Sequence, residues 1–272
     1  MTATQSHLAR DRAPISDSSW QEIHSEAKRT LEHFLTGRRL VDFSGPHGWE
    51  KDSVPHGRAQ DISEEASDGV RARLRSLQPL VEYRADFTLA RAELEVIDRG
   101  EGDADLEPVR DAARRLALHE DAAIFHGHKA AMIDGIVPSS PNPRLQIDDD
   151  YNQYPSTVAR AVSILKGAGV GGPYSVALGP RCYTGVVETT ELGGYPVLEH
   201  LRLITGGQVL WAPAVDGAVV MSTRGGDFML TVGQDASIGY VDHDADAVRL
   251  YLETSFTFQA WSPEAAVHLN YS

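Results

Sequence analysis

The sequence predicts an α+β protein. Residues 16–35 and 105–129 show the apolar spacing of helices, and residues 248–261 alternate with a period of two. Apolar residues at three- and four-residue intervals are typical of an amphipathic helix, whereas a period of two is typical of a half-buried strand. Helical and strand-like segments follow one another irregularly, without repeated strand–helix–strand units, which favours α+β over α/β.

The composition is that of an ordinary globular chain. Of the 272 residues, 42% are hydrophobic and 24% are charged, which is enough to build a sizeable core in one or two domains. The net charge of −14 argues against nucleic acid as a partner, because such binding needs basic surfaces. No run approaches the ~20 apolar residues that span a bilayer, and the start lacks a signal-peptide core. We therefore expect a cytoplasmic protein without a membrane partner.

The first helix is expected to begin near Ser16 and to end before Gly37. Ser16 is one possible N-cap, and Ser19 with Glu22 has the spacing of a capping box. Gly37 is the natural C-cap. The apolar face consists of Trp20, Ile23, Ala27, Leu31, Phe34 and Leu35.

The middle of the chain is predicted to contain an extended segment and a long helix. Residues 43–84 are rich in Gly, Pro, Asp and Ser, a composition unlike that of a compact core. Residues 105–129 form the longest predicted helix, with Pro108 suited to its first turn. Glu120 and Asp121 lie inside this helix, where we expect them to pair with arginines rather than act as acid and base.

The second half of the chain mixes short helices and strands. A helix is predicted to end near Gly167, a strand to span residues 174–178 and a helix to begin at Pro196. The "GGDF" stretch resembles a phosphate-binding glycine loop, but strand-like runs flank it on both sides. Gly225 and Gly226 are therefore predicted to form the turn of a β-hairpin.

Residues with catalytic or metal-binding chemistry do not form a recognisable site. His126 and His128 would point about 200° apart on a helix, so surface histidines are expected. The run 148–150 consists of three aspartates without the alternating ligands of a calcium loop. Cys182 is the only cysteine, which excludes an intrachain disulfide and favours a packed thiol. We expect no catalytic residue, no metal site and no cofactor.

Several longer motifs resemble the shell proteins called encapsulins. They occur in the family's order from about residue 8 to residue 269, and the last three are especially specific. The motifs are "FTLARAELEVIDRG", "EDAAIFHG", "GPYSVAL", "RGGDF", "GQDASIGY" and "VRLYLETSFTF".

The resemblance implies the fold of tailed-phage major capsid proteins of the Hong Kong phage type. This fold has a peripheral domain, an axial domain and an extended loop. The expected division is a lumen-facing N-terminal helix in residues 1–42, the extended loop in 43–84, a peripheral part with the spine helix in 85–139, the axial domain in 140–215 and peripheral strands in 216–272.

The implied function is a self-assembling shell that encloses cargo enzymes. About sixty copies would form the smallest icosahedral shell, and larger shells are possible. The cargo in this family is often a ferritin-like protein or a dye-decolorizing peroxidase, held by a short targeting peptide and serving iron storage or protection from oxidative stress. The alternatives are an enzyme such as a hydrolase or protease, which lacks an identifiable nucleophile and base, and a phage capsid protein, which would need a scaffold region or maturation cleavage.

The resemblance also implies two functional surfaces and the loss of a third. Cargo docking is expected at Leu31, Leu35, Arg38, Asp42 and Ile238, although the three apolar residues could equally fill the core. A loop at the five-fold axis is expected at residues 188–196. Its named members are Glu188, Glu191, Gly193, Gly194 and Tyr195, and the two glutamates would form an acidic ring. Some relatives stack a flavin on a tryptophan, but the matching residue here is Ala92.

Overall fold

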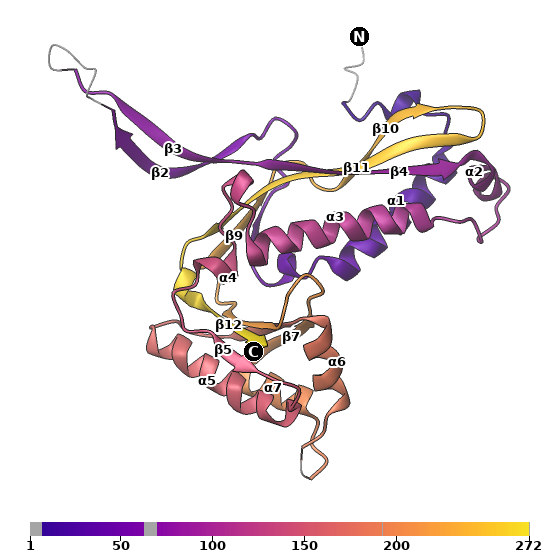
Figure 1. Cartoon of the computed structure of the whole chain (residues 1–272). Coiled ribbons are helices and arrows are strands. Elements are labelled where there is room, and N and C mark those ends of the chain that lie inside the picture. Colours follow the sequence, from indigo (N-terminus) through magenta and orange to yellow (C-terminus); the bar gives the residue numbers. More distant parts are fainter. Residues whose placement is uncertain (1–6, 63–69, 192, 272) are drawn as a thin grey trace.

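The computed structural model describes residues 7–62, 70–191 and 193–271. Two units are joined by long strands, and a two-stranded arm projects from the upper unit (Figure 1). The mixed architecture confirms the predicted α+β class.

The upper unit is built on a five-stranded sheet with β11 (Ala247–Ala260) at its centre. The first part of β11 pairs antiparallel with β10 (Ser237–His243) and β4 (Val81–Ala90). Its second part pairs antiparallel with β9 (Phe228–Val232), which in turn runs parallel to β1 (Asp42–Ser44). The alternating pattern that predicted a long strand at residues 248–261 is therefore confirmed.

The upper unit also contains three helices, α1 (Asp17–Phe34), α2 (Arg91–Asp98) and α3 (Glu107–His126). Helices α1 and α3 lie side by side next to this sheet (Figure 1). Ser16 is the N-cap of α1, because its Oγ accepts a hydrogen bond from Ser19 N at 3.1 Å. The prediction that Gly37 caps the other end is wrong, since Leu35 is the C-cap. Gly37 instead begins a short 3-10 turn, η2 (Gly37–Arg39), where a Cβ would lie 2.8 Å from Ile124 Cδ1.

The spine helix is slightly shorter than the predicted 105–129 but keeps Pro108 in its first turn. It ends at His126 because Gly127 turns away with φ +83°, and a Cβ there would lie 2.5 Å from Asp134 O. Short helical turns follow at η4 (Lys129–Ala131) and α4 (Ile136–Ser139).

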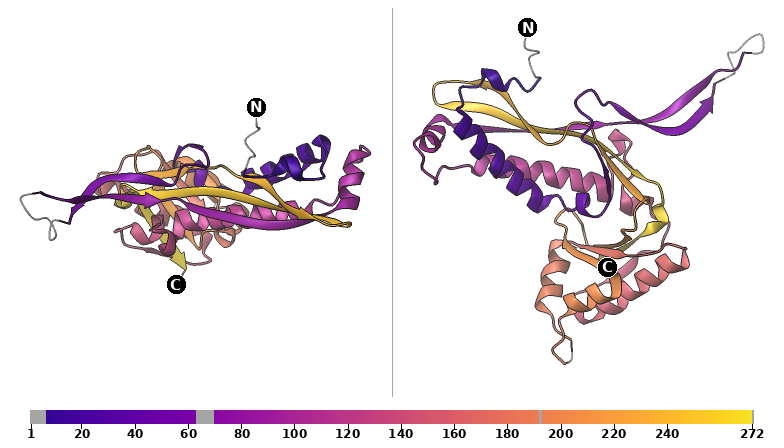
Figure 2. Two further views of the ribbon diagram at one scale, coloured as in Figure 1. Left: turned by 90° about the horizontal axis from the view of Figure 1, so that it is seen from above. Right: turned by 180° about the vertical axis from the view of Figure 1, so that it is seen from behind.

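The segment expected to be extended forms the projecting arm. Its strands β2 (Ser53–Asp61) and β3 (Arg73–Pro79) pair antiparallel, and β3 leads directly into β4 (Figures 1 and 2). Much of the arm faces away from the body: Leu74 is 60% exposed and Leu77 is 55% exposed.

The lower unit contains a second five-stranded sheet. The strand order is β5 (Leu145–Ile147), β12 (Ala266–Tyr271), β8 (Ala218–Ser222), β6 (Tyr174–Leu178) and β7 (Gly206–Trp211). Thus the predicted strand at residues 174–178 is confirmed. The domain boundary expected at residue 216 does not follow this sheet, because β8 and β12 pair within it.

Helices α5 (Tyr154–Gly167), α6 (Pro180–Glu188) and α7 (Val197–Thr205) belong to the same unit. Two predictions are confirmed here: α5 ends at Gly167, and Pro196 is the N-cap of α7. The remaining short turns are η1 (Arg10–Arg12), η5 (Tyr151–Gln153) and η6 (Pro263–Ala265).

The predicted β-hairpin around Gly225 and Gly226 is wrong, although the two glycines do form a turn. The flanking strands β8 and β9 belong to different sheets, so residues 223–227 connect the two units. Both glycines have left-handed backbone angles, with φ +87° and +81°. The turn does not lead into a helix, which is consistent with the rejection of a phosphate loop.

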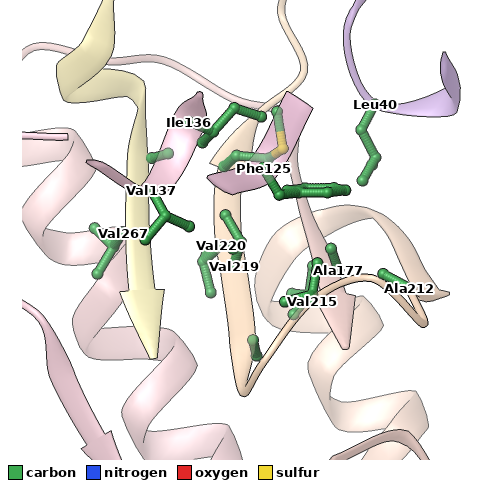
Figure 3. Close-up of a cluster of buried hydrophobic side chains, with 14 of the residues drawn as sticks. Leu40, Phe125, Ile136, Val137, Ala177, Ala212, Val215, Val219, Val220 and Val267 are labelled. Atoms are coloured by element: carbon green, nitrogen blue, oxygen red, sulfur yellow. The ribbon is translucent and has the colours of Figure 1, made fainter. Parts of the chain in front are cut away.

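Two hydrophobic clusters form the core. The larger cluster extends from the lower sheet to β9 and the end of α3, and Phe125 lies within it near Ile136 and Leu40 (Figure 3). The second cluster packs α1 and α3 against β4, β10 and β11. This second core positions the groove described below, since α1 and β10 form its two sides.

Candidate docking groove

A groove of about 580 Å³ lies between α1 and the start of β10. This volume is within the usual range for ligand sites, roughly 300–1,000 Å³. Charged side chains, including Lys28, Glu32 and Arg39, alternate with apolar ones along it. The apolar lining consists of Ala27, Leu31, Leu35, Ala236, Ile238 and Leu252.

Four of the five residues expected to dock cargo lie together in this groove: Leu31, Leu35, Arg38 and Ile238. The apolar three are also core residues, since their exposed fractions are 8%, 9% and 1%. They form the floor, where a bound apolar side chain would contact a surface already fixed by packing.

Arg38 is held by two carboxylates rather than left free. Its Nε and Nη2 donate to the two oxygens of Glu120 at 2.6 and 2.8 Å, and its Nη1 donates to Asp235 at 2.7 Å. Burial alone would lower the pKa of Arg38, but the hydrogen bonds and negative charges of Glu120 and Asp235 raise it above its ordinary value. The expectation that Glu120 pairs with an arginine is confirmed. These bonds hold Arg38, which lies at one end of the groove, against α3.

Asp42, the fifth predicted docking residue, does not line this groove. Its Oδ2 accepts a hydrogen bond from Gly226 N at 2.5 Å, and it lies in a separate small cleft with Gly225. Its carboxylate therefore holds the turn that connects the two units. The sequence could not show this, because Asp42 and Gly226 are 184 positions apart.

Asp121 is a residue whose role sequence reasoning missed. It does not pair with an arginine as expected. Instead, its two oxygens accept the backbone N–H groups of Thr36 and Gly37 at 2.8 and 3.0 Å, in full burial. Burial and the neighbouring negative charge of Glu120 raise the pKa of Asp121 to about 8, against the effect of these donors. The two acidic residues of α3 thus fix the turn that ends the groove.

His24 lines the opposite end of the groove and was also missed. Its Nδ1 lies 2.6 Å from Trp20 O, while its Nε2 is buried and has no hydrogen-bond partner within the described residues. Burial lowers the pKa of His24, the bond to Trp20 O opposes this, and the positive charge of Arg10 lowers it further. A neutral ring is therefore favoured at this end of the groove.

The loop expected at the five-fold axis forms a small projection between α6 and α7 (Figure 1). Glu191 N donates to Tyr195 O at 2.8 Å, and Gly194 N donates to Glu191 O at 2.9 Å. Gly193 and Gly194 have φ of +112° and +82°, and Tyr195 is exposed. The carboxylate of Glu191 lies 2.8 Å from His200 Nδ1.

Glu188 differs from Glu191 in its surroundings. It is exposed at the end of α6, and no hydrogen bond or ion pair of its side chain is found in the described part of the chain. Of the two predicted acidic residues, Glu188 is therefore the one whose charge faces solvent without a side-chain partner among the described residues.

The histidines and aspartates considered above for catalysis or metal binding do not come together in one site. His126 lies near Ala214 O and His128 near the Tyr83 hydroxyl, at 2.9 and 2.7 Å. The aspartates at 148–150 are exposed, and Asp149 pairs with Arg181. Among residues 7–62, 70–191 and 193–271, no three metal-ligating side chains lie close enough to hold an ion.

Two further positions named in the sequence analysis are Cys182, expected to be a packed thiol, and Ala92, which matches a flavin-stacking tryptophan of some relatives. Cys182 is a buried free thiol, 3.3 Å from the Tyr154 hydroxyl, which fits the packed thiol expected from the sequence. Ala92 lies exposed on α2 and offers only a methyl group, so this position cannot stack on a flavin ring.

In the described chain, no helix is long and apolar enough to cross a bilayer.

The two-unit architecture with a projecting arm places the chain in a recognisable structural class. A virus-like particle subunit from Pyrococcus furiosus matches with a TM-score of 0.66 at 15% identity, covering 91% of this chain and 98% of that one. A chain from Gordonia phage Cozz matches with a TM-score of 0.55 at 14% identity, covering 88% and 87%. The chain therefore has the fold of phage capsid proteins, as expected.

Sequence comparison identifies the family within this class. The family model described as "Encapsulating protein for peroxidase" matches residues 5–257. Type 1 encapsulin shell proteins from Rhodospirillum rubrum and Mycolicibacterium paratuberculosis are 50% and 49% identical, with coverage of 96% and 97% of this chain and 95% and 98% of theirs. The chain belongs to the encapsulin shell protein family.

Proposed function

We propose that the chain is the shell subunit of an encapsulin compartment in the bacterial cytoplasm. The arm is the observation that supports this most directly. Leu74 and Leu77 are exposed on a two-stranded ribbon, and a ribbon of this kind has little stability in water on its own. A neighbouring copy that covers the arm would bury these side chains, and repetition of one such contact with closure generates a finite shell.

The test is the mass of the purified protein. Sixty copies of a 29.6 kDa chain would form a particle of about 1.8 MDa. Light scattering combined with electron microscopy should show hollow particles of this mass or larger. A single species of about 30 kDa at micromolar concentration would contradict the proposal.

We further propose that the groove between α1 and β10 holds the targeting peptide of the cargo. Its floor is apolar, its two sides come from the rigid upper core, and its charged rim can set the direction of a bound segment. Each peptide can bind weakly, since many sites in one shell act together on multivalent cargo. The cargo class expected from the family is a peroxidase or a ferritin-like protein.

Blocking the groove tests this docking role without removing core residues. Ala236 lines the groove and is partly exposed, so Ala236→Arg should fill the groove while leaving the core in place. Gln21→Arg adds the same charge to an exposed position of α1 outside the groove. Shells with Ala236→Arg should assemble but contain little cargo, whereas Gln21→Arg shells should load normally. Equal cargo content in both would place docking elsewhere.

A further inference from the structure

The N-terminal residues 7–12 form a strap beside β10 (Figure 1). Tyr240 N donates to Leu8 O at 2.9 Å, and Arg10 Nε donates to Ile238 O at 2.5 Å. β10 is the last strand on this side of its sheet and pairs with β11 on the other side. The strap therefore covers an edge that no other described strand covers.

His7, at the start of the strap, is held from two sides. Its Nε2 lies 3.1 Å from Oε1 of Glu253 near the middle of β11, and its ring stacks on Trp49 with the centroids 4.0 Å apart. The Glu253 side chain is 4% exposed, and burial together with the negative charge of Glu82 raises its pKa. His7 and the charge of Arg84 lower this pKa and so favour the ionised carboxylate. His7 is thus fastened to the sheet while it contacts Trp49.

Trp49 lies at the base of the projecting arm, in the connection between β1 and β2. The backbone is tied down on both sides of it: Gly48 N donates to Gly233 O at 2.8 Å, and Leu80 N donates to Asp52 O at 2.8 Å. The side chain of Trp49 is less restrained. It is 44% exposed, and the stack on His7 is its one ring contact with the described residues. The strap therefore supplies the contact that holds this side chain.

These contacts join three parts of the chain that are far apart in the sequence: the strap, the centre of the upper sheet and the base of the arm. An arm that moves freely about its base loses conformational entropy when a neighbouring copy covers it. A contact that fixes the base before binding lowers this cost.

We propose that the strap is a clasp on the arm: through His7 it fixes Trp49, so that the strap and the base of the arm open and close as one unit. The closed clasp orients the arm before a neighbouring copy binds it, which favours shell assembly at low subunit concentration. The part that concerns assembly rests on the proposed shell function, whereas the coupling of strap and arm base is a property of the single chain.

Hydrogen exchange of assembled shells tests the coupling from both ends. His7→Ala should speed the exchange of Gly48 N at the arm base roughly tenfold, because a ring stack and a hydrogen bond to a charged group are lost. Trp49→Ala should in turn speed the exchange of Tyr240 N, which the strap protects, because coupling between two sites is reciprocal. The double variant should add little to either single variant, since each removes the same contact. Unchanged exchange in α3 verifies that the variants are folded.

Arg12→Ala and Trp261→Ala are the matched controls. Arg12 is exposed on the same strap, and Trp261 is a tryptophan of similar exposure, 54%, just after the end of β11. Neither change should alter the exchange of Gly48 N or Tyr240 N. The clasp is disproved if Trp49→Ala leaves Tyr240 N as protected as in the wild type, or if the controls speed both amides as much as the clasp variants do.

The role in assembly is measured by diluting dissociated subunits from guanidinium chloride and recording the lowest concentration that yields shells. This concentration should rise roughly fivefold in His7→Ala and Trp49→Ala, the effect of one side chain that must be ordered on association, and should not change in the controls. Equal values in the wild type and the clasp variants would show that the clasp does not aid assembly. Normal shells from a chain without residues 53–79 would remove the proposed role of the arm in the shell, whereas the exchange results on the clasp would still stand.

Discussion

At the residue scale, the groove depends on charges that are buried beneath it. Glu120 is almost fully buried and relies on Arg38 for compensation. Removing one partner of such a pair leaves an uncompensated buried charge, which is more costly than replacing both partners with neutral groups.

Arg38→Ala should therefore lower the free energy of unfolding by about 3 kcal/mol. The double variant Arg38→Met with Glu120→Gln should recover much of this loss, because no unpaired buried charge then remains: Asp235, the other partner of Arg38, is partly exposed to solvent. Urea midpoints of the assembled shells provide the comparison. If the double variant were no more stable than the single one, the destabilisation would come from lost packing rather than from charge.

Asp121 gives the fold a pH dependence near neutrality. Its pKa rises from an ordinary 3.8 to about 8 in the folded chain, so between these values the folded state binds more protons than the unfolded state. The free energy of unfolding should consequently fall as the pH rises from about 4 to about 8.

Asp121→Asn should flatten this part of the stability profile. Melting temperatures of shells between pH 5.5 and 8.5 would show a smaller decline for the variant than for the wild type. Asp111→Asn is the control, because arginine neighbours lower the pKa of partly exposed Asp111 and keep its titration below this window. An unchanged slope in Asp121→Asn shells would show that another group causes the decline.

At the element scale, the projecting loop between α6 and α7 separates two acidic residues that look alike in the sequence. Glu191 lies against His200, whereas Glu188 is exposed without a partner in the described chain. If the loop surrounds a pore, Glu188 attracts cations more strongly, because a paired carboxylate contributes less to the potential in the opening.

Glu188→Gln should accordingly slow ferrous iron entry into loaded shells more than Glu191→Gln does, and the double variant should add little to Glu188→Gln. Uptake is measured by iron oxidation inside the shell at low ionic strength, where the potential is least screened. Equal rates in wild-type and Glu188→Gln shells would exclude an acidic ring at this position.

Local sequence patterns predicted some of the helices and strands correctly but not the pairing of others. Periodicity was sufficient for α3, α5, α7 and β11, since each buries one face in a repeating pattern. It failed for β8 and β9, because two short apolar runs around Gly225 and Gly226 satisfy the pattern of a hairpin. The actual partners are β6 and β12 for β8, and β1 and β11 for β9, so contacts distant in the sequence decide which sheet each strand joins.

The contacts in the docking groove likewise could not be predicted from local sequence patterns. The resemblance to the family named four residues of the groove, but no local pattern reveals that Arg38 is bound to Glu120 and Asp235, which are 82 and 197 positions away. His24 escaped notice for a similar reason. Its place in the groove depends on a ring nitrogen that becomes buried in the fold, which leaves no signal in the sequence.

At the scale of the whole molecule, the arm makes a stable lone subunit unfavourable. Its strands carry Arg58, Arg73 and Arg75, and Arg71 lies just before β3, in a chain with a net charge of −14. The arm is therefore suited to an acidic surface on a neighbouring copy as well as to an apolar one.

Replacing residues 53–79 by a short Gly-Ser linker should abolish closed particles while leaving the two cores intact. Analytical ultracentrifugation would show small species, and circular dichroism would retain the helical signal of α1 and α3. Changing the four arginines to glutamine should instead give particles that assemble with less dependence on salt. Normal shells from the arm-deleted chain would show that other contacts suffice.

The long strand β11 also determines how the subunit would bear mechanical load. It pairs with β4 over ten residue positions and then with β9, which leads through the turn at 223–227 to the lower unit. A pull on the arm acts along the axis of β4, so the hydrogen bonds to β11 would be loaded in shear and would have to break together. Outward pressure from contents accumulating inside a shell would thus become tension shared by both units.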